Sequence, residues 1–339
     1  MEYVSLGRTG LKVSQISFGT WRFGRESSGT IETGKEEAHE LLDAAWEQGI
    51  NFIDTANLYG DVNGTSEKYI GAWLDAHDRE DFVIASKVYY PFNGRGDPGP
   101  NDSGLGRKHI RTQIEGTLNR LNTDYLDIYY IHRWDEATPI LETLRTLEEL
   151  VREGTVHHLG ASTIAAWKLM KALGTSSIHD LERFEISQPP FDATYNNMKR
   201  YEGFDLHSYL DVCEDQRLAV CPYSPLAGGF LTGKYSRDGD WPTDSRGVLA
   251  ANDFNRKYIS DSAWAVHDSL CEIATEIDAT PAQVALRWLI QQQRFETVVP
   301  IIGARTVEQI EENVGASEIE LKSEHLTRIQ QARVSTGEE

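Results

Sequence analysis

The sequence has only three cysteines and no apolar run long enough to cross a membrane. Cys213, Cys221 and Cys271 are too few and too widely spaced for a disulfide framework or a tetrahedral metal site, so we expect buried thiols and no bound metal. A spanning helix needs about 18 apolar residues, and the N-terminus carries no charged segment followed by an apolar stretch. These absences predict a cytoplasmic protein that is neither exported nor anchored in a membrane.

Positive charge is also scarce, because 33 lysines and arginines stand against 53 aspartates and glutamates, for a net charge of −20 at pH 7. An excess of negative charge repels phosphate backbones and anionic lipid headgroups, which argues against nucleic-acid and membrane partners. The same excess keeps a protein surface hydrated in concentrated salt. We therefore hypothesise a salt-adapted cytoplasm, with an ordinary acidic enzyme as the alternative. The sequence does not indicate an oligomeric state.

Short β-branched or aromatic segments alternate with longer amphipathic ones, the pattern of β/α units around a parallel sheet. Strands are expected at Gln15–Gly19, Asn51–Thr55, Phe82–Lys87, Leu126–His132, His157–Ala161, Phe184–Gln188, Ala219–Tyr223 and Thr297–Ile301. Helices are expected between them at Lys35–Gln48, Ser66–Ala76, Arg107–Leu121, Pro139–Glu153, Ile164–Ala172 and Asp205–Gln216. Eight such units predict an α/β fold, a (β/α)8 TIM barrel that occupies residues 1–339 as a single domain.

Other segments lie outside this alternation. Residues Tyr3–Leu6 and Leu11–Val13, joined by a turn that contains glycines, predict a β-hairpin that plugs one end of the barrel. Near the C-terminus we expect extra helices at Ser262–Ile277, Thr280–Gln292 and Ser323–Val334. Residues 90–100 and 230–258 are rich in glycine, proline or polar residues and are expected to form long loops.

Polar residues end three consecutive predicted strands, where a barrel of this kind has its active site. Asp54 and Lys87 lie at the ends of the second and third strands, and His132 ends the fourth. Tyr59 follows Asp54 by five residues, on the next loop. Taken singly, these residues could be a turn cap, a lysine with its ammonium in solvent, and a core histidine. Together they predict a functional cluster.

Two other classes of site are not supported. A barrel hydrolase or isomerase would need paired carboxylates or metal ligands at the strand ends, and we find neither. A Rossmann domain would carry Gly-x-Gly-x-x-Gly after its first strand, and this sequence does not.

From Leu6 to about Gly315 the chain resembles the aldo-keto reductase superfamily. The resemblance rests on Asp54-Thr55-Ala56, Tyr59-Gly60, Lys87, His132-Arg133, Gly160-Ala161-Ser162, Gln188, the segment from Tyr223 to Gly229, Gly303-Ala304-Arg305, Gln309, Glu312 and Asn313. The Tyr-Ser-Pro-Leu stretch with Leu231-Thr232-Gly233-Lys234 is most similar to the aryl-alcohol-dehydrogenase-like branch, which includes the potassium-channel β subunits. The resemblance to the superfamily implies reversible, nicotinamide-dependent reduction of small aldehydes or ketones.

The three strand-end residues and Tyr59 suit that reaction. Reduction of a carbonyl needs a hydride from the cofactor and a proton from the protein. Tyr59 is the predicted proton donor, and Lys87 would stabilise the phenolate that develops, since a free tyrosine has a pKa near about 10. Asp54 would keep Lys87 charged, and His132 would hydrogen-bond the substrate oxygen.

The resemblance also implies the cofactor site. Ser162 and Gln188 would bind the nicotinamide carboxamide and Tyr223 would lie against the ring, while Thr163 stands where the family usually has asparagine. The full predicted set is Gly19, Thr20, Trp21, Ser162, Thr163, Gln188, Tyr223, Ser224, Pro225, Leu226, Gly228, Lys234, Gly303, Arg305, Gln309, Glu312 and Asn313. Arg305 favours NADPH over NADH, because a guanidinium can pair with the 2′-phosphate.

Aromatic residues just after the predicted strand ends could line an apolar substrate pocket, namely Trp21, Phe23, Tyr89, Tyr90 and Trp134. The sequence does not identify the carbonyl substrate or the direction of the reaction in the cell. A second hypothesis is a cofactor-binding regulatory or scaffold subunit with weak turnover, like the channel β subunits.

The salt hypothesis makes a direct prediction. If the acidic surface is an adaptation to salt, the purified protein keeps its reductase activity as KCl rises beyond about 2 M, because hydrated carboxylates hold water at the surface. Initial rates measured over a series of KCl concentrations test this. Inactivation above about 2 M would contradict the hypothesis and favour the ordinary acidic enzyme.

Overall fold

The computed structural model describes residues 1–27, 30–92, 99–195, 204–239 and 241–334, and in it eight parallel strands curl into one sheet. Their order is β11-β10-β9-β8-β7-β6-β3-β12, with bounds β3 (Ser17–Gly19), β6 (Phe52–Asp54), β7 (Val83–Val88), β8 (Leu126–Ile131), β9 (Val156–Ser162), β10 (Phe184–Gln188), β11 (Ala219–Val220) and β12 (Ile301–Ile302). Parallel bridges from Val220 to Val298 and from Tyr223 to Ile301 join the two edges. The sheet therefore closes, and the predicted barrel is confirmed.

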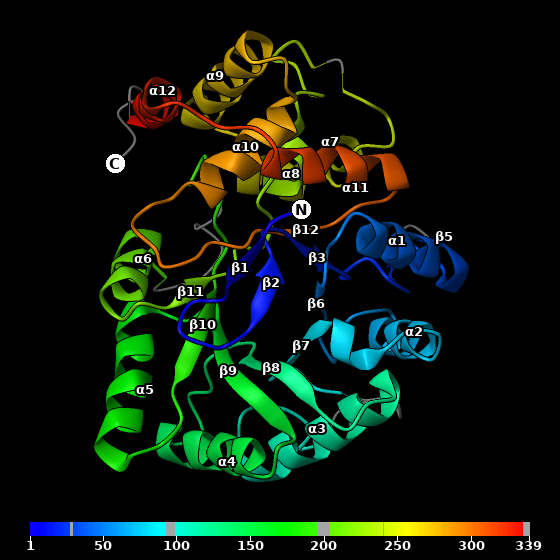
Figure 1. Ribbon diagram of the computed structural model, residues 1–339, viewed down its shortest axis with the longest axis vertical. Helices are drawn as coiled ribbons and strands as arrows, with labels where there is room; N and C mark the ends of the chain where they lie inside the picture. The colour runs from blue at the N-terminus through cyan, green and yellow to red at the C-terminus, as the bar shows by residue number, and fades with distance from the viewer. Residues whose placement is uncertain (28–29, 93–98, 196–203, 240, 335–339) are drawn as a thin grey trace.

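Helices surround the strands on the outside of the sheet (Figure 1). Those of the β/α units are α1 (Lys35–Glu47), α2 (Thr65–Leu74), α3 (Arg107–Leu121), α4 (Ile140–Arg152), α5 (Ala166–His179), α6 (Leu206–Asp215), α10 (Pro281–Ile290) and α11 (Val307–Val314). The extra helices are α9 (Asp261–Glu276) and α12 (Ser323–Val334), which pack against each other. Segments of 3-10 helix lie at η1 (Arg79–Asp81), η3 (Ala227–Thr232) and η4 (Gly315–Ser317), and η3 is interrupted by the non-helical Gly228 and Gly229. Within the described ranges, none of the helices is long and apolar enough to cross a membrane.

The alternation of side chains along each strand divides the core into two parts. Phe52, Ala85 and Tyr130 belong to a buried cluster that fills the barrel. Their sequence neighbours on the strands, such as Ile53 and Ile84, belong to a larger cluster between the sheet and the helices. A side chain two residues beyond a filler of the barrel therefore faces the interior at the next level up.

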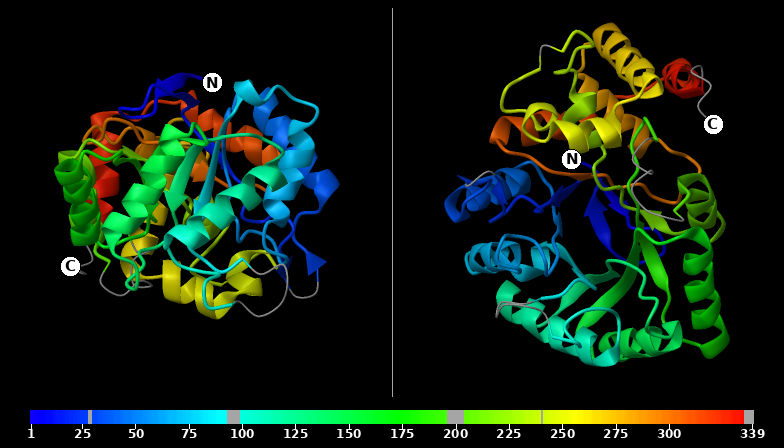
Figure 2. Two further views of the ribbon diagram at one scale, coloured as in Figure 1. Left: turned by 90° about the horizontal axis from the view of Figure 1, so that it is seen from below. Right: turned by 180° about the vertical axis from the view of Figure 1, so that it is seen from behind.

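The N-terminal hairpin closes one end of the barrel. Its strands β1 (Tyr3–Ser5) and β2 (Lys12–Ser14) are antiparallel, and Leu6 and Val13 are fully buried among the residues that fill the barrel. Gly7, at the turn, lies so close to the backbone of Ala219 that a Cβ would stand 3.1 Å from its nitrogen. In the left view of Figure 2 the hairpin (blue) and the segment that precedes α9 (yellow) lie at opposite ends of the molecule.

Part of the segment predicted as a loop is helical. Within residues 230–258 lie α7 (Arg246–Leu249) and α8 (Ala251–Tyr258), because Phe254 and Tyr258, one turn apart, are both buried and Phe254 packs against Phe230 and Tyr235. A short hairpin, β4 (Glu26–Ser27) and β5 (Thr30–Ile31), was not predicted either. Most of the predicted loop at 90–100, residues 93–98, lies outside the described residues.

Two helical glycines make opposite predictions for stability. A Cβ at Gly71 in α2 would stand 2.2 Å from the carbonyl oxygen of Arg120, a backbone atom of α3, whereas a Cβ at Gly174 in α5 would meet nothing within 4 Å. Gly71→Ala should therefore lower the free energy of unfolding by about 1–3 kcal/mol through overpacking. Gly174→Ala should raise it by about 0.5–1 kcal/mol, because alanine has less backbone entropy to lose.

Urea unfolding followed by circular dichroism measures both variants against the wild type. Equal effects of the two substitutions would contradict the close approach of α2 and α3.

Candidate active site

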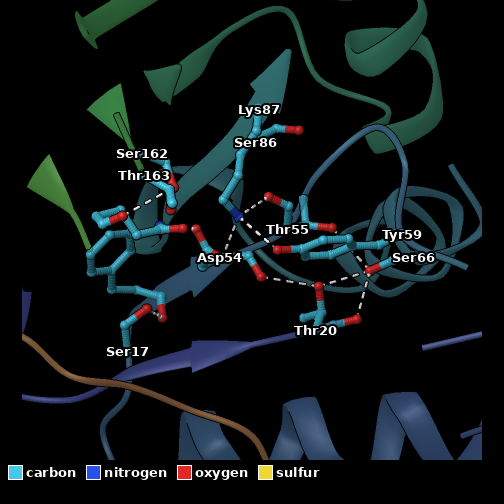
Figure 3. Close-up of polar contacts among 12 residues, drawn as sticks. Ser17, Thr20, Asp54, Thr55, Tyr59, Ser66, Ser86, Lys87, Ser162 and Thr163 are labelled. Atoms are coloured by element: carbon cyan, nitrogen blue, oxygen red, sulfur yellow. Dashed lines mark hydrogen bonds and ion pairs between the residues drawn. The ribbon is translucent and has the colours of Figure 1, made fainter. Parts of the chain in front are cut away.

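The predicted strand-end residues meet at the open end of the barrel, as Figure 3 shows for Asp54, Tyr59 and Lys87. Asp54 ends β6, two residues beyond Phe52, and Lys87 lies in β7, two residues beyond Ala85. His132 follows β8 directly, two residues beyond Tyr130. Each therefore faces inward, one level above the apolar filling of the barrel, because side chains two apart on a strand share a face.

Lys87 is the centre of this group. Its side chain is 0% exposed, and its Nζ donates to Asp54 Oδ1 at 2.6 Å, to the Thr55 carbonyl at 2.7 Å and to Tyr59 Oη at 3.1 Å. Burial alone lowers the pKa of Lys87, but the Asp54 carboxylate and Tyr59 outweigh it, so that the pKa lies above its usual value. The ammonium is therefore charged and holds the Tyr59 hydroxyl in place.

Hydroxyl groups hold the strand ends that carry these residues, a role that was not predicted for them, although Thr20 was among the predicted cofactor residues. Thr20 Oγ1 donates to the Asp54 carbonyl at 3.0 Å. Ser66 Oγ lies 2.7 Å from Thr20 Oγ1 and 2.9 Å from Thr55 Oγ1, all of them buried (Figure 3). Ser66, in the first turn of α2, is thus hydrogen-bonded to residues that follow β3 and β6. The loop that carries Tyr59 joins β6 to α2, so these contacts hold both of its ends.

His132 lies beside Tyr59, with ring centroids 6.2 Å apart, and the edge of Tyr90 packs on it at 5.1 Å. Loss of water around the ring, together with the nearby positive charges of Lys87 and Arg133, lowers the pKa of His132 well below its usual value. The imidazole is therefore neutral at physiological pH. Its Nδ1 is buried without a hydrogen-bond partner among the described residues.

The residues predicted to bind a nicotinamide occupy the ends of β9, β10 and β11. Ser162 Oγ donates to the Gln188 carbonyl at 3.0 Å, and Thr163 Oγ1 donates to Tyr223 Oη at 3.3 Å. The Gln188 amide also donates to Asp54 Oδ2 at 2.8 Å, across the barrel. The sequence assigned Gln188 to the cofactor side, and the structure adds this link between that side and the Lys87–Asp54 ion pair.

The loops that follow β11 and β12 carry most of the other predicted cofactor residues. Ser224, Gly228 and Gly229 have φ values of +53°, +67° and +94°, and Thr163 has a φ of +48°. A positive φ is costly for a residue with a Cβ, and such strain is concentrated at functional sites. The remaining members of the predicted set lie on these loops or on α11, which follows the second of them, namely Pro225, Leu226, Lys234, Gly303, Arg305, Gln309, Glu312 and Asn313.

Arg305 lies beside Asp244 of the segment that precedes α7. Its guanidinium donates to the Asp244 carbonyl at 2.9 Å and approaches the Asp244 carboxylate at 3.7 Å. Its backbone nitrogen donates to Gln309 Oε1 at 2.8 Å. The loop after β12 is therefore joined to the loop after β11, and the side chain of Asn313, on the same helix as Gln309, is buried.

The aromatic residues predicted to line a substrate pocket do not all lie at the mouth. Tyr89 and Tyr90 pack edge to face at 5.2 Å, and Tyr90 Oη accepts from Arg133 at 2.8 Å, next to His132. Trp134 packs beside the ammonium groups of Lys168 and Lys171.

Phe23 differs from this expectation. Its side chain is 1% exposed and packs against Phe18 in the shell between sheet and helices, because the chain turns inward after Trp21. Its surroundings are those of a core residue. Trp21, in contrast, is 38% exposed.

Three arginines that were not among the predicted site residues lie near this mouth. Arg22 and Arg25 follow β3, and Arg246 begins α7. The ring of Trp21 lies between Arg25 at 3.7 Å and Arg246 at 5.1 Å. The chain has a net charge of −20, yet three arginines lie on the loops after its first and seventh strands. This concentration of positive charge could have been recognised in the sequence.

No group of three or more His, Cys, Asp or Glu residues in the described part of the chain could hold a metal ion. The three cysteines are free thiols, and burial raises the pKa of Cys213 to about 12.

Comparison with known proteins gives a consistent result. The sequence profile described as the Aldo/keto reductase family matches residues 15–334. A relative from Arabidopsis thaliana named "Probable voltage-gated potassium channel subunit beta" is 35% identical over 324 residues, 94% of this chain and 92% of the relative. "Uncharacterized oxidoreductase YrpG" of Bacillus subtilis is 34% identical over 334 residues, 96% and 94% of the two chains. "Norsolorinic acid reductase stcV" of Emericella nidulans is 30% identical over 325 residues, 95% and 78% of the two chains.

The lowered pKa of His132 predicts how stability depends on pH. As the pH falls through about 6.5, the unfolded chain takes up a proton at this residue and the folded protein does not. The free energy of unfolding therefore falls, with a slope from this group that approaches about 1.4 kcal/mol per pH unit below pH 6. His132→Gln should remove that slope.

Urea unfolding of the wild type and His132→Gln between pH 7.5 and 5.5 measures the difference. His179→Gln, which removes an exposed histidine at the end of α5, is the matched control. Parallel curves for the wild type and His132→Gln would show that His132 takes up its proton in the folded protein over the same pH range as in the unfolded chain, and would contradict the lowered pKa.

Proposed function

The chain belongs to the aldo/keto reductase family, and on that premise we propose that it reduces small aldehydes or ketones with NADPH, as one catalytic domain, with Tyr59 as the proton donor. That the chain is an oxidoreductase follows from the family and from relatives named as reductases. The finer assignment is supported chiefly by one observation, the Tyr59 hydroxyl held 3.1 Å from the buried Lys87 ammonium.

The residues of the chain account for the movement of the proton. The carbonyl oxygen gains a proton from Tyr59 Oη, and the phenolate left behind is stabilised by the Lys87 ammonium at hydrogen-bond distance. Asp54, at 2.6 Å, keeps that ammonium charged. His132 is neutral, so it can donate a hydrogen bond to the carbonyl oxygen without adding a second cation beside Lys87. When bound, the reduced nicotinamide supplies the hydride for the carbonyl carbon.

The mouth of the barrel fits a dinucleotide phosphate. Gly228 and Gly229 carry no side chain and have a positive φ, and a Cβ at Gly228 would stand 2.8 Å from the ring of Tyr258, so the turn after β11 requires glycine there. Lys234 and Arg305 stand on the loops after the seventh and eighth strands, where barrels of this class often bind phosphate. Ser162, Gln188 and Tyr223 would hold the nicotinamide end, and Arg305 supports NADPH over NADH because guanidinium and phosphate pair through two hydrogen bonds.

Two broader features belong to the same proposal. The aromatic rings of Tyr89 and Tyr90 beside His132 support an apolar carbonyl substrate. The net charge of −20 supports action in a salt-adapted cytoplasm.

A second candidate function is favoured by the comparisons. The relative from Arabidopsis thaliana, 35% identical to this chain, is named as a potassium-channel β subunit. A regulatory subunit that binds the cofactor tightly and turns over slowly would account for the same residues.

One assay tests the proposal and separates the two functions. NADPH oxidation is followed by absorbance with 4-nitrobenzaldehyde as substrate, and NADPH binding is measured separately. Tyr59→Phe should lower kcat at least about 100-fold, because the general acid is lost, and should change the Kd of NADPH little. Tyr69→Phe, which removes a hydroxyl from the outer helix α2, is the matched control and should keep the wild-type kcat.

Unimpaired turnover by Tyr59→Phe would refute the role of Tyr59. Tight NADPH binding by the wild type with negligible turnover would favour the regulatory subunit.

A further inference from the structure

Five cationic side chains gather at the mouth of a barrel whose chain is strongly acidic. Arg22, Arg25, Lys234, Arg246 and Arg305 come from the loops after the first, seventh and eighth strands. Arg22 interacts electrostatically with Arg25, Arg246 and Arg305, and Lys234 interacts with Arg22, Arg246 and Arg305. The group therefore forms one cluster with contributions from three loops.

The carboxylates near this cluster do not balance it. Glu32 lies 3.2 Å from Arg22 and 3.7 Å from Arg25, and Asp244 lies 3.7 Å from Arg305. Asp61 interacts with Arg25 at longer range. Among the described residues, these three carboxylates thus face five cations. Like charges held this close repel one another, and a folded protein keeps such an arrangement where an anion is to be bound.

The guanidinium of Arg22 is more enclosed than those of Arg25 and Arg305, whose side chains are each 35% exposed. Its side chain is 16% exposed, and its Nε is buried without a hydrogen-bond partner in the part of the chain that the structure describes. Burial, opposed by Glu32 and reinforced by Arg305, Arg246 and Arg25, lowers the pKa of Arg22 to about 10. An unused donor on an enclosed cation is a place for an acceptor oxygen, because an unpaired buried donor costs free energy.

The chemistry of the cluster favours a phosphate monoester over a phosphate diester. Near pH 7 a monoester carries a charge of about −1.5 to −2, whereas each phosphorus of a dinucleotide pyrophosphate carries about −1. Two or more guanidiniums can share the three terminal oxygens of a monoester through paired hydrogen bonds. Lys234 would serve the pyrophosphate as a point charge, which leaves the arginines for a more highly charged group.

We infer that Arg22 determines cofactor specificity by binding the 2′-phosphate of NADPH together with Arg305, with Glu32 occupying Arg22 when the phosphate is absent. This inference rests on the proposed function and adds the loop after the first strand to the phosphate site. Arg25 and Arg246 complete the cluster and hold Trp21 between them.

Calorimetric titration with NADPH and with NADH, without substrate, tests the inference by binding alone. Arg22→Gln should raise the Kd of NADPH about tenfold or more and change the Kd of NADH less than about threefold, since a charge-assisted contact to the 2′-phosphate is lost. Arg305→Ala should show the same pattern. Arg8→Gln removes an equal charge from an exposed site on the hairpin at the other end of the barrel, so both Kd values should stay as in the wild type.

Glu32→Gln gives a prediction of opposite sign. It removes the carboxylate that competes for Arg22 and keeps the cation, so the Kd of NADPH should fall while that of NADH stays the same. A merely structural role of the Arg22–Glu32 pair would instead weaken the binding of both cofactors in both variants.

The outcomes separate this inference from the proposed function. If wild-type protein binds NADPH and NADH equally, the proposed cofactor preference fails and the inference fails with it. If the wild type prefers NADPH and Arg22→Gln keeps that preference, the inference alone is overturned.

Discussion

The burial of the Lys87 ammonium is the constraint on which the mouth of the barrel depends. A lysine without access to water is costly unless its three donors all find acceptors. Here they find the Asp54 carboxylate, the Thr55 carbonyl and the Tyr59 hydroxyl. The position of Tyr59 is thus set by the solvation of a cation on a neighbouring strand. The same need fixes Asp54, whose second oxygen accepts from Gln188 on the far side of the barrel.

The sequence predicted the features that depend on local order along the chain. The period of two along each strand brings Asp54 and Lys87 to the level above Phe52 and Ala85, and the carboxyl ends of parallel strands share one edge. The eight strands and most helices were found within a few residues of their predicted bounds for the same reason. Strand β11 is shorter than predicted, although hydrogen bonds to its neighbours continue as far as Tyr223.

Features that depend on contacts between distant segments were not predicted. Gln188 and Asp54 are 134 residues apart, and no local pattern connects an amide on one strand with a carboxylate on another. Helix α8 forms in a polar segment because two aromatic residues one turn apart find a buried surface. The place of Phe23 just after a strand predicts a residue of the mouth, but the direction of the chain beyond Trp21 buries it in the shell between sheet and helices. Lys234 and Arg305 were predicted as cofactor residues, but no local pattern brings them together with Arg22, Arg25 and Arg246, because the cluster is assembled from three loops.

The N-terminal hairpin has a kinetic consequence for everything that binds above it. Because Leu6 and Val13 seal the floor of the barrel, a molecule can reach the Lys87 level from one side alone. When molecules can enter and leave a site from one end alone, they must bind and dissociate in a fixed order. Whatever lies deepest must arrive first and depart last, and the occupant nearer the rim sets the rate at which the deeper one can be exchanged.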